Sequence, residues 1–324
     1  MIMHKACIYF FSLILFVNFS QTLQAQNNEL LGSYKIAFIG KDKESSKYKA
    51  VFSGIKDAAK TLGKQLFIEV EVLELSPIQN QEDTQSEAII QSFLKNVDGI
   101  ILSPAENENL STALKLIQFH KKEIVLLEQP VSSIAPLLSI QPNEFRAGKL
   151  AAKALLKQLP TKGRVAILTS SQPSDILKQR MQGVKSILGY KRIETVIKTD
   201  PNYKSALKSI KQAEDNDVDH YIKGWLFLDD WGLRGMPDLP WQPNALPLVA
   251  IQSSATTNLF YDLGYLNAMV LHPYHDWGYQ ASEVLIKKLF RKQSPAKNVT
   301  IPEPILVNWE NIDVYKKYWR EWLD

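Results

Sequence analysis

Mostly apolar runs and segments with a helical repeat of apolar residues alternate along the chain from residue 34 onward. Residues 34–39 (YKIAFI) predict a buried strand, whereas residues 47–62 predict a helix because their apolar positions recur at steps of three and four. Gly63 is expected to end that helix. Residues 67–75 (FIEVEVLEL) alternate apolar and acidic positions, which is typical of an outer strand of a sheet.

The alternation of strands and helices continues to residue 251. Thr84 and Glu87 form a capping box, which predicts that a helix begins there and runs to residue 94. The further predicted strands are 99–102, 123–127, 137–140, 164–169, 192–198, 221–228 and 246–251, and the further predicted helices are 110–120, 144–159, 175–188 and 203–214. Short connections between alternating strands and helices indicate right-handed β-α-β units and parallel sheets. Two such sheets, rather than one very wide sheet, fit about 300 residues.

Residues 140–159 (IQPNEFRAGKLAAKALLKQL) divide this pattern into two halves. Pro142 keeps Gln141 out of a helix, and Asn143 can then cap one. The apolar face of this helix is narrow and contains small residues such as Gly148, so it can lie close to a sheet. We therefore expect the chain to cross here between two lobes, and we expect the functional site to lie in the cleft that the crossing spans.

Composition and charge favour an ordinary globular protein. Of the 324 residues, 45% are hydrophobic and 22% are charged, and the length suffices for two cores of typical domain size. The formal net charge of +4 is small and the charged residues are scattered, which is typical of a solvated surface. We therefore expect no nucleic-acid partner.

The first 25 residues have the pattern of a secretory signal peptide. One lysine lies within residues 1–5, residues 6–19 are mostly apolar, and a polar stretch leads to Leu-Gln-Ala at residues 23–25. This apolar run is short for a membrane span, so we predict cleavage after Ala25, with an uncleaved anchor as the alternative. Cys7 is the only cysteine and lies inside this segment, so the mature chain would have no thiol, disulfide or thiolate metal site.

An ordered set of short motifs resembles the periplasmic sugar-binding proteins of the ribose-binding type, the solute receptors of ABC importers. The motifs are DGIILSP at 98–104, EIVLLEQPV at 123–131, NEFRAGKLAA at 143–152, RMQGVKSIL at 180–188, KGWLFLDDWGLRG at 223–235, a long closing segment at 248–281 and PILVNWENIDVY at 304–315. Each motif alone is weak, but together they cover nearly all of residues 34–315 in the family's order.

The resemblance implies an α/β fold of two Rossmann-like lobes with parallel sheets, joined by a three-strand hinge. It places the crossings near residues 141–143, 271–273 and 300–304, so that the N-terminal lobe comprises 32–141 plus 273–300 and the C-terminal lobe 142–272 plus 301–324. It also implies a monomer in the periplasm. The related sugar-responsive repressors share these lobes but begin with a helix-turn-helix, and here a predicted signal peptide stands in its place, which argues against DNA binding.

The resemblance places three candidate ligand-binding residues in the N-terminal lobe, where ligands meet the carboxyl ends of parallel strands. Lys47 and Tyr48 fall where the family has a pair of aromatic residues, and only Tyr48 is aromatic here. The alternative interpretation of Tyr48 is a tyrosine that faces solvent. Glu128 and Gln129 follow a strand where the family has an Asp and a polar partner. The alternative for Glu128 is a surface carboxylate.

The C-terminal lobe supplies five candidates. Arg180 matches the arginine with which the family holds its ligand, and its alternative is a salt bridge on a helix surface. Tyr203 begins a helix where family members often present an aromatic ring, the alternative being simple packing. Asp229 and Asp230 occupy the family's Asn-Asp position, and Trp231 beside them is expected to be a stacking platform or a cap on the lobe.

Two further candidates depart from the family pattern. Gln252 ends a strand where Asp is usual, and His272 stands at the second crossing where Gln is usual. Gln252 can still bridge two hydroxyl groups, as planar side chains do in sugar sites, but it carries no charge. These departures put the standard pentose and hexose ligands in doubt without affecting the expected fold.

Enzyme and metal chemistry are not expected. Residues 272–276 (HPYHD) lack the spacing of a helical His-x-x-x-His pair, so we expect no metal site there. Adjacent residues such as Asp229 and Asp230 at a strand end point to opposite sides, so they are poor partners in acid/base catalysis. The sequence has no nucleophile elbow, phosphate loop or dinucleotide motif. We therefore expect no catalytic residue and no cofactor.

These observations predict an extracytoplasmic receptor that captures a sugar or sugar-like small molecule by hinge closure and delivers it to an ABC permease. The alternative is a periplasmic sensing subunit that docks on a membrane histidine kinase or chemoreceptor. For that alternative the aromatic tail at residues 315–324 (YKKYWREWLD) would be a docking surface. Its simpler interpretation is a helix packed on the C-terminal lobe.

Overall fold

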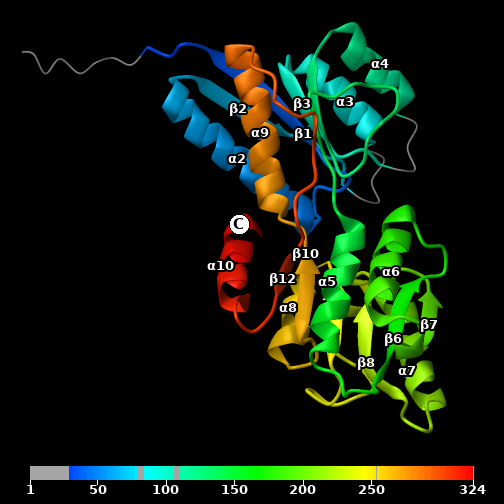
Figure 1. Ribbon diagram of the computed structural model, residues 1–324. Helices are drawn as coiled ribbons and strands as arrows, with labels where there is room; N and C mark the ends of the chain where they lie inside the picture. Colours follow the sequence, from blue (N-terminus) through cyan, green and yellow to red (C-terminus); the bar gives the residue numbers. More distant parts are fainter. Residues whose placement is uncertain (1–28, 79–83, 106–109, 253, 324) are drawn as a thin grey trace, which may run out of the picture.

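A computed structural model describes residues 29–78, 84–105, 110–252 and 254–323 (Figure 1). The predicted signal peptide at residues 1–25 lies outside these ranges. Within them the chain forms two α/β lobes, each built around a six-stranded sheet. The chain passes between the two sheets after β5, after β10 and after β11. The predicted α/β class with two lobes is confirmed.

The N-terminal lobe has the sheet order β11-β5-β4-β3-β1-β2, with every pair parallel. Its strands are β1 (Ser33–Ile39), β2 (Glu69–Glu74), β3 (Gly99–Leu102), β4 (Glu123–Leu127), β5 (Leu138–Ile140) and β11 (Val299–Thr300), and its helices are α2 (Ser46–Leu66), α3 (Gln85–Leu94), α4 (Ser111–Phe119) and α9 (Tyr274–Arg291). Strand β2 lies at the edge of the sheet, as its alternating pattern predicts.

The C-terminal lobe has the sheet order β12-β10-β9-β8-β6-β7. Its strands are β6 (Arg164–Ser170), β7 (Ile193–Thr199), β8 (Ile222–Phe227), β9 (Leu248–Ile251), β10 (Ala268–Leu271) and β12 (Ile305–Val307), and its helices are α5 (Glu144–Leu156), α6 (Asp175–Leu188), α7 (Tyr203–Asn216) and α8 (Ala255–Asp262), with short 3₁₀ turns η1 (Tyr190–Arg192) and η2 (Trp231–Leu233). Strand β12 runs antiparallel to β10, whereas the sequence predicted parallel strands throughout.

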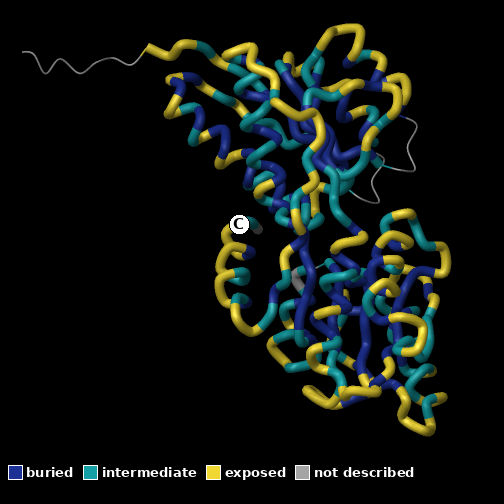
Figure 2. The backbone as a smooth tube through the Cα atoms, in the orientation of Figure 1, coloured by how far each residue is buried: buried dark blue, intermediate teal, exposed yellow. Residues whose placement is uncertain are grey.

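Alternate residues of β1 show how each sheet buries both faces. Ile36 and Phe38 pack with α2 and α9, whereas Ala37 and Ile39 pack with α3 and α4. Successive side chains of a strand point to opposite faces, so an apolar run without alternation requires helices on both sides. Figure 2 shows the result, because buried positions follow the strands while exposed positions follow the outer helices and loops.

Two helix ends differ from the predicted ones by three residues or more. Helix α2 does not end at Gly63 but continues to Leu66, and Phe67 adopts the left-handed conformation at its end. Leu66 is buried beside Ile286, and this burial outweighs the cost of about 1 kcal/mol for a glycine inside a helix. Helix α5 ends at Leu156 rather than at residue 159.

Glycine pairs bring one pair of helices into close contact in each lobe. A Cβ on Gly148 of α5 would lie 2.0 Å from the Arg180 oxygen of α6, and a Cβ on Gly183 of α6 would lie 2.0 Å from the Phe145 oxygen of α5. Gly54 of α2 and Gly278 of α9 make the matching approach in the other lobe. The small-residue face of α5, which the sequence placed against a sheet, therefore contacts helix α6 at Gly148. This contact positions Arg180.

Helix α10 (Ile312–Leu323) contacts both lobes (Figure 1). Ile312 belongs to the core of the C-terminal lobe, Trp319 is buried in the core of the N-terminal lobe, and Tyr315 packs against both. Lys316 forms an ion pair with Asp262 of α8. The simpler interpretation of a helix packed on the C-terminal lobe holds for Ile312 and Lys316, whereas the aromatic residues of the second half of α10 find their apolar partners in α2 and α9.

Candidate ligand-binding cleft

A cavity of about 350 Å³ lies between the two lobes and is lined from both sides. The N-terminal lobe contributes Lys47, Glu128, Tyr274 and Trp277 to its lining. Six of the ten predicted residues line it, namely Glu128, Arg180, Asp229, Trp231, Gln252 and His272. The cavity is within the size range of small-molecule sites, and polar groups converge in it from several strand ends.

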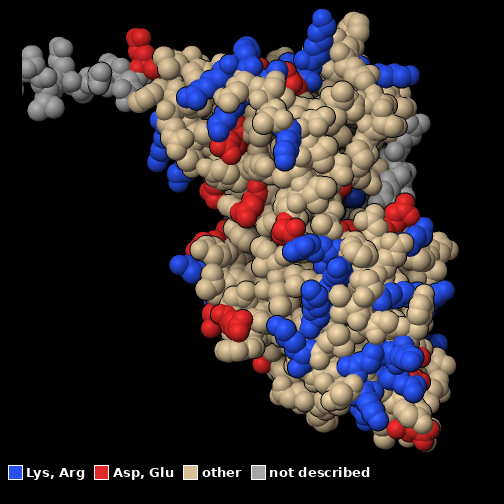
Figure 3. Space-filling model, in the orientation of Figure 1, with Lys and Arg blue, Asp and Glu red and all other residues tan. Residues whose placement is uncertain are grey.

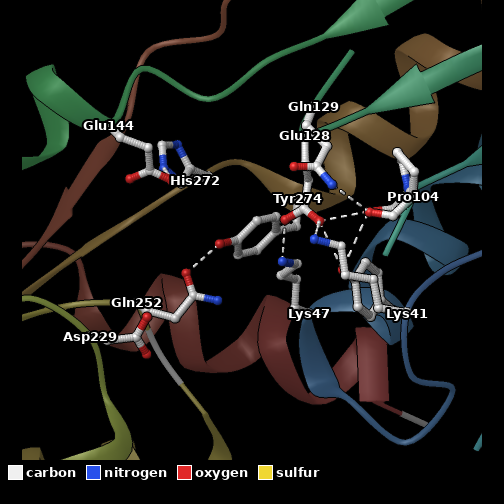
Figure 4. Close-up of polar contacts among 12 residues, drawn as sticks. Lys41, Lys47, Pro104, Glu128, Gln129, Glu144, Asp229, Gln252, His272 and Tyr274 are labelled. Atoms are coloured by element: carbon white, nitrogen blue, oxygen red, sulfur yellow. Dashed lines mark hydrogen bonds and ion pairs between the residues drawn. The ribbon is translucent and has the colours of Figure 1, made fainter. Parts of the chain in front are cut away.

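Glu128 follows β4 and points into the cleft from a left-handed backbone, with φ of 70° (Figure 4). Its backbone N–H donates to the Ile140 oxygen at 2.8 Å. Its carboxylate accepts hydrogen bonds from Tyr48 Oη at 2.8 Å and Ser103 Oγ at 2.6 Å. The strand end therefore fixes both the backbone and the carboxylate of Glu128.

Two lysines neutralise the Glu128 carboxylate. Lys47 Nζ forms a close ion pair with Oε1, and Lys41 Nζ lies 3.3 Å from Oε2. Burial by itself raises the pKa of Glu128, but the charges of Lys47 and then Lys41 outweigh it and hold that pKa well below its usual value. The side chain of Glu128 is 8% exposed, so the alternative of a surface carboxylate is wrong.

Gln252 occupies the position in the C-terminal lobe that Glu128 occupies in the N-terminal lobe. It follows β9, has φ of 81°, and donates its backbone N–H to the Val270 oxygen of β10 at 2.8 Å. Its side-chain Oε1 accepts a hydrogen bond from Tyr274 of α9 across the lobes (Figure 4). A left-handed backbone is rare for a residue with a side chain and costs about 1–3 kcal/mol, and such residues cluster at ligand sites.

Arg180 of α6 lies at the base of the cleft and is 3% exposed. Its Nε and Nη2 donate to the two oxygens of Glu144 at 2.6 and 3.1 Å. Its Nη1 donates to the Leu228 oxygen at 2.8 Å and to Asp229 Oδ2 at 3.1 Å. Arg180 therefore makes a buried ion pair inside its own lobe, and the alternative of a salt bridge on a helix surface is wrong.

Glu144 is the first residue of α5 and carries a perturbed carboxyl group. Burial raises its pKa, but Arg180, and then His272, lower the pKa to about 2. His272 Nε2 lies 3.3 Å from Glu144 Oε1, so the second crossing segment contacts the helix that follows the first (Figure 4). Asn143 caps α5 as predicted, since its side chain accepts from the Arg146 N–H at 3.0 Å.

The adjacent carboxylates after β8 have different surroundings. Asp230 is fully buried and accepts from Arg234 Nε at 2.9 Å and Nη2 at 2.6 Å. Asp229 faces the cavity, and its burial and the neighbouring Asp230 raise its pKa to about 6 despite Arg180 and Arg234. The expectation that one of the pair faces the cleft is met by Asp229.

The other predicted residues lie beside the cleft or away from it. Tyr48 is 5% exposed and supports Glu128, so it does not face solvent. Gln129 donates to the Pro104 oxygen at 2.9 Å, and Tyr203 donates to the Met236 oxygen and packs against Gly235. Trp231 lines the cavity but is only 3% exposed, as part of the lobe's core.

Sequence reasoning missed Lys41, Glu144, Tyr274 and Trp277. Glu144 has the pattern of an ordinary acidic residue in a first helical turn, and Lys41 follows a strand without any motif. Tyr274 and Trp277 directly follow the second crossing, and this position was the one sequence feature that could have marked them as cleft residues.

In the described ranges no group of three His, Cys, Asp or Glu side chains could hold a metal. None of the helices in these ranges combines the length and apolar character of a membrane span.

Comparison with known proteins agrees with this architecture. The sequence profile of the periplasmic binding protein domain family matches residues 36–293. A search of curated proteins found no match.

Solved structures share the fold at low sequence identity. The periplasmic ribose ABC transporter protein of Conexibacter woesei is 15% identical, with a TM-score of 0.74 over 91% of this chain and 99% of its own. The arabinose-binding protein AraP of Geobacillus stearothermophilus is 18% identical, with a TM-score of 0.73 over 87% and 99%. An ABC transporter solute-binding protein of Agrobacterium vitis, bound to α-D-tagatopyranose, is 17% identical, with a TM-score of 0.70 over 86% and 96%. The predicted type I periplasmic binding protein fold is thereby confirmed.

Proposed function

The chain belongs to the periplasmic binding protein domain family, and from this membership we propose that it captures a sugar or sugar-like small molecule in the cleft between its lobes. The observation that carries the proposal is the cavity of about 350 Å³, because polar side chains of both lobes line it. The similar structures named for ribose, arabinose and tagatopyranose support this class of ligand.

The lining offers the two kinds of contact that a sugar needs. Gln252 presents an amide and Asp229 a carboxylate, and such planar groups can bridge neighbouring hydroxyls. Tyr274, Trp277 and Trp231 all line the same cavity from buried positions, and an aromatic ring there can cover the C–H face of a sugar ring. The charged groups are paired with one another, which favours a neutral polyhydroxylated ligand over an ion.

Hinge closure is the proposed mechanism. A ligand that contacts Lys47 and Glu128 on one lobe and Asp229 and Gln252 on the other gains most of its contacts only when the lobes approach. It therefore stabilises the closed arrangement by its differential affinity for the two states. Arg180 positions Asp229 and fixes the base of the cleft through Glu144.

The proposed role is delivery of the ligand to an ABC importer in the periplasm, without catalysis. In the alternative of a sensing subunit, the aromatic tail at residues 315–324 could be a docking surface. In the structure Trp319 and Tyr315 of α10 are used for packing against the two lobes, which favours the importer role.

Thermal unfolding of the chain from residue 26 to 324 against a panel of sugars, polyols, nucleosides and signalling molecules tests the proposal. A ligand at 100 times its Kd adds roughly 2.7 kcal/mol to the free energy of unfolding. For lobes of this size we expect a rise in the midpoint of about 2–4 °C per kcal/mol. A shift with one sugar supports the proposal, whereas a shift with a signalling molecule alone contradicts it and favours the sensor.

A further inference from the structure

A second cavity lies outside the cleft, where α10 covers the crossing segments. Its volume is about 560 Å³, which falls in the range of small-molecule sites. It is lined by Pro273 of the second crossing, by β12, by one face of α10 and by residues at the facing parts of α2 and α9. None of its lining residues lines the cleft cavity, so the two are separate.

Aromatic rings form an ordered stack along this cavity. Trp322 stacks on His275 with ring centroids 5.2 Å apart and planes 15° apart, and it stacks on Tyr318 at 6.1 Å and 11°. Tyr318 is 48% exposed, so its ring is accessible from the cavity. The π-face of such a ring attracts a cation, and recognition of ammonium groups by aromatic cages uses this attraction.

The charged groups of the lining are mostly negative. Asp57, Asp276 and Glu321 contribute carboxylates, and His275 is the only basic residue in the described lining. His275 Nε2 lies 2.9 Å from Asp57 and its Nδ1 lies 3.7 Å from Asp276. Glu321 forms no ion pair with any residue in the described ranges. The lining therefore stays negative even when His275 is protonated, and Figure 3 shows acidic side chains at the waist between the lobes.

We propose that this cavity binds a small organic cation, whose ammonium or guanidinium group is held by the exposed aromatic face of Tyr318 and by the carboxylate of Glu321, while Trp322, stacked on both His275 and Tyr318, orients the Tyr318 ring. The three carboxylates attract a cation and repel an anion. A bare metal ion would find no group of three ligands among the described residues. The apolar side chains of Ile305, Val307 and Val314 suit the carbon part of an organic cation.

Isothermal titration calorimetry with matched probes tests this assignment on the chain from residue 26 to 324. Choline is compared with 3,3-dimethyl-1-butanol, which has the same shape without the charge, and ethylguanidinium with ethylurea. We expect at least one cation to bind about threefold or more tightly than its neutral match, as a cation–π contact requires. Equal binding within both pairs, or no binding of either cation, overturns the proposal. So does binding of a trilysine peptide alone, which would make this surface a peptide-docking site.

Single substitutions locate the site. Tyr318→Ala and Glu321→Gln should each weaken binding of the cation about threefold or more. Glu310→Gln is the matched control, because Glu310 is exposed near the start of α10 and does not line the cavity. Unchanged affinity in both Tyr318→Ala and Glu321→Gln would overturn the assignment. Each variant is first checked by thermal unfolding without ligand, and the outcome is independent of sugar binding in the cleft.

Discussion

Arg180 and Glu144 form a two-point ion pair at the base of the cleft, with N···O distances of 2.6 and 3.1 Å. The pair joins α6 to the first residue of α5, and both side chains are at most 5% exposed. It lies where the chain enters the C-terminal lobe, and His272 of the second crossing contacts the same carboxylate. The pair thus fixes the start of the lobe and the position of Asp229 together.

Glu144→Gln should lower the free energy of unfolding at pH 7 by about 1–3 kcal/mol, since Arg180 would lose a charged partner while staying buried. The folded-state pKa of Glu144 is about 2, below the unfolded value near 4.3, so its stabilisation is complete above about pH 4.3 and is lost as pH falls toward 2. Urea unfolding at pH 7 and pH 3 measures this. Glu194→Gln, in the exposed pair with Arg164, is the control and should cost less than about 1 kcal/mol.

Asp229→Asn should have the opposite pH dependence. The pKa of Asp229 is about 6 in the folded state, above the unfolded value near 3.9, so its ionisation lowers the stability of the folded protein progressively as pH rises from about 3.9 to about 6. The substitution is expected to stabilise the ligand-free protein by roughly 1 kcal/mol at pH 7.5 and by less at pH 4.5. Equal effects at both pH values in urea unfolding would contradict the assigned cause.

Several of these features were accessible from the sequence. The strand ends at Glu128 and Gln252 were predicted because apolar runs stop there, and residues after parallel strands gather at one edge of a sheet. Glu144 and Lys41 were not predicted, because their roles depend on the approach of α6 and of β4, which no local pattern encodes. Tyr203 had the correct helix start but packs on Gly235, a contact set by the η2 segment.

The cross-lobe bond from Tyr274 to Gln252 gives a test of the cleft itself. Tyr274→Phe removes one hydrogen bond, which should cost about 0.5–1.5 kcal/mol of stability. It also frees the Gln252 amide for a ligand, so affinity for an identified ligand should not fall. Gln252→Ala should lower that affinity about tenfold, since it removes the amide. Calorimetric measurement of ligand affinity in both variants tests whether Gln252 or Tyr274 holds the ligand. Equal losses of affinity would show that Tyr274 itself holds it.

The contact of α5 and α6 predicts a steric effect at Gly183. A Cβ there would lie 2.0 Å from the Phe145 oxygen, so the helices must separate. Gly183→Ala is expected to destabilise the protein by about 1–3 kcal/mol, although alanine is the better helix former. Gln182→Ala, on the exposed face of the same helix, is the control and should change stability by about 0.5 kcal/mol or less. A stabilising effect of Gly183→Ala in thermal unfolding would rule out the close approach.

Substitutions in helix α10 distinguish most directly between a packing role and a docking role for this helix. Trp319 is 4% exposed and packs in the core of the N-terminal lobe, whereas Val314 on the same helix is 57% exposed. Trp319→Ala should lower the free energy of unfolding by about 3–5 kcal/mol, because it removes a large buried ring and leaves a cavity. Val314→Ala should cost less than about 1 kcal/mol. Because Ile312 is anchored in the C-terminal lobe, loss of Trp319 should also weaken the coupling between the lobes. Calorimetric unfolding of Trp319→Ala would then show a broader or divided transition. An unchanged midpoint would mean that α10 does not support the fold, and a docking role for α10 would then be favoured.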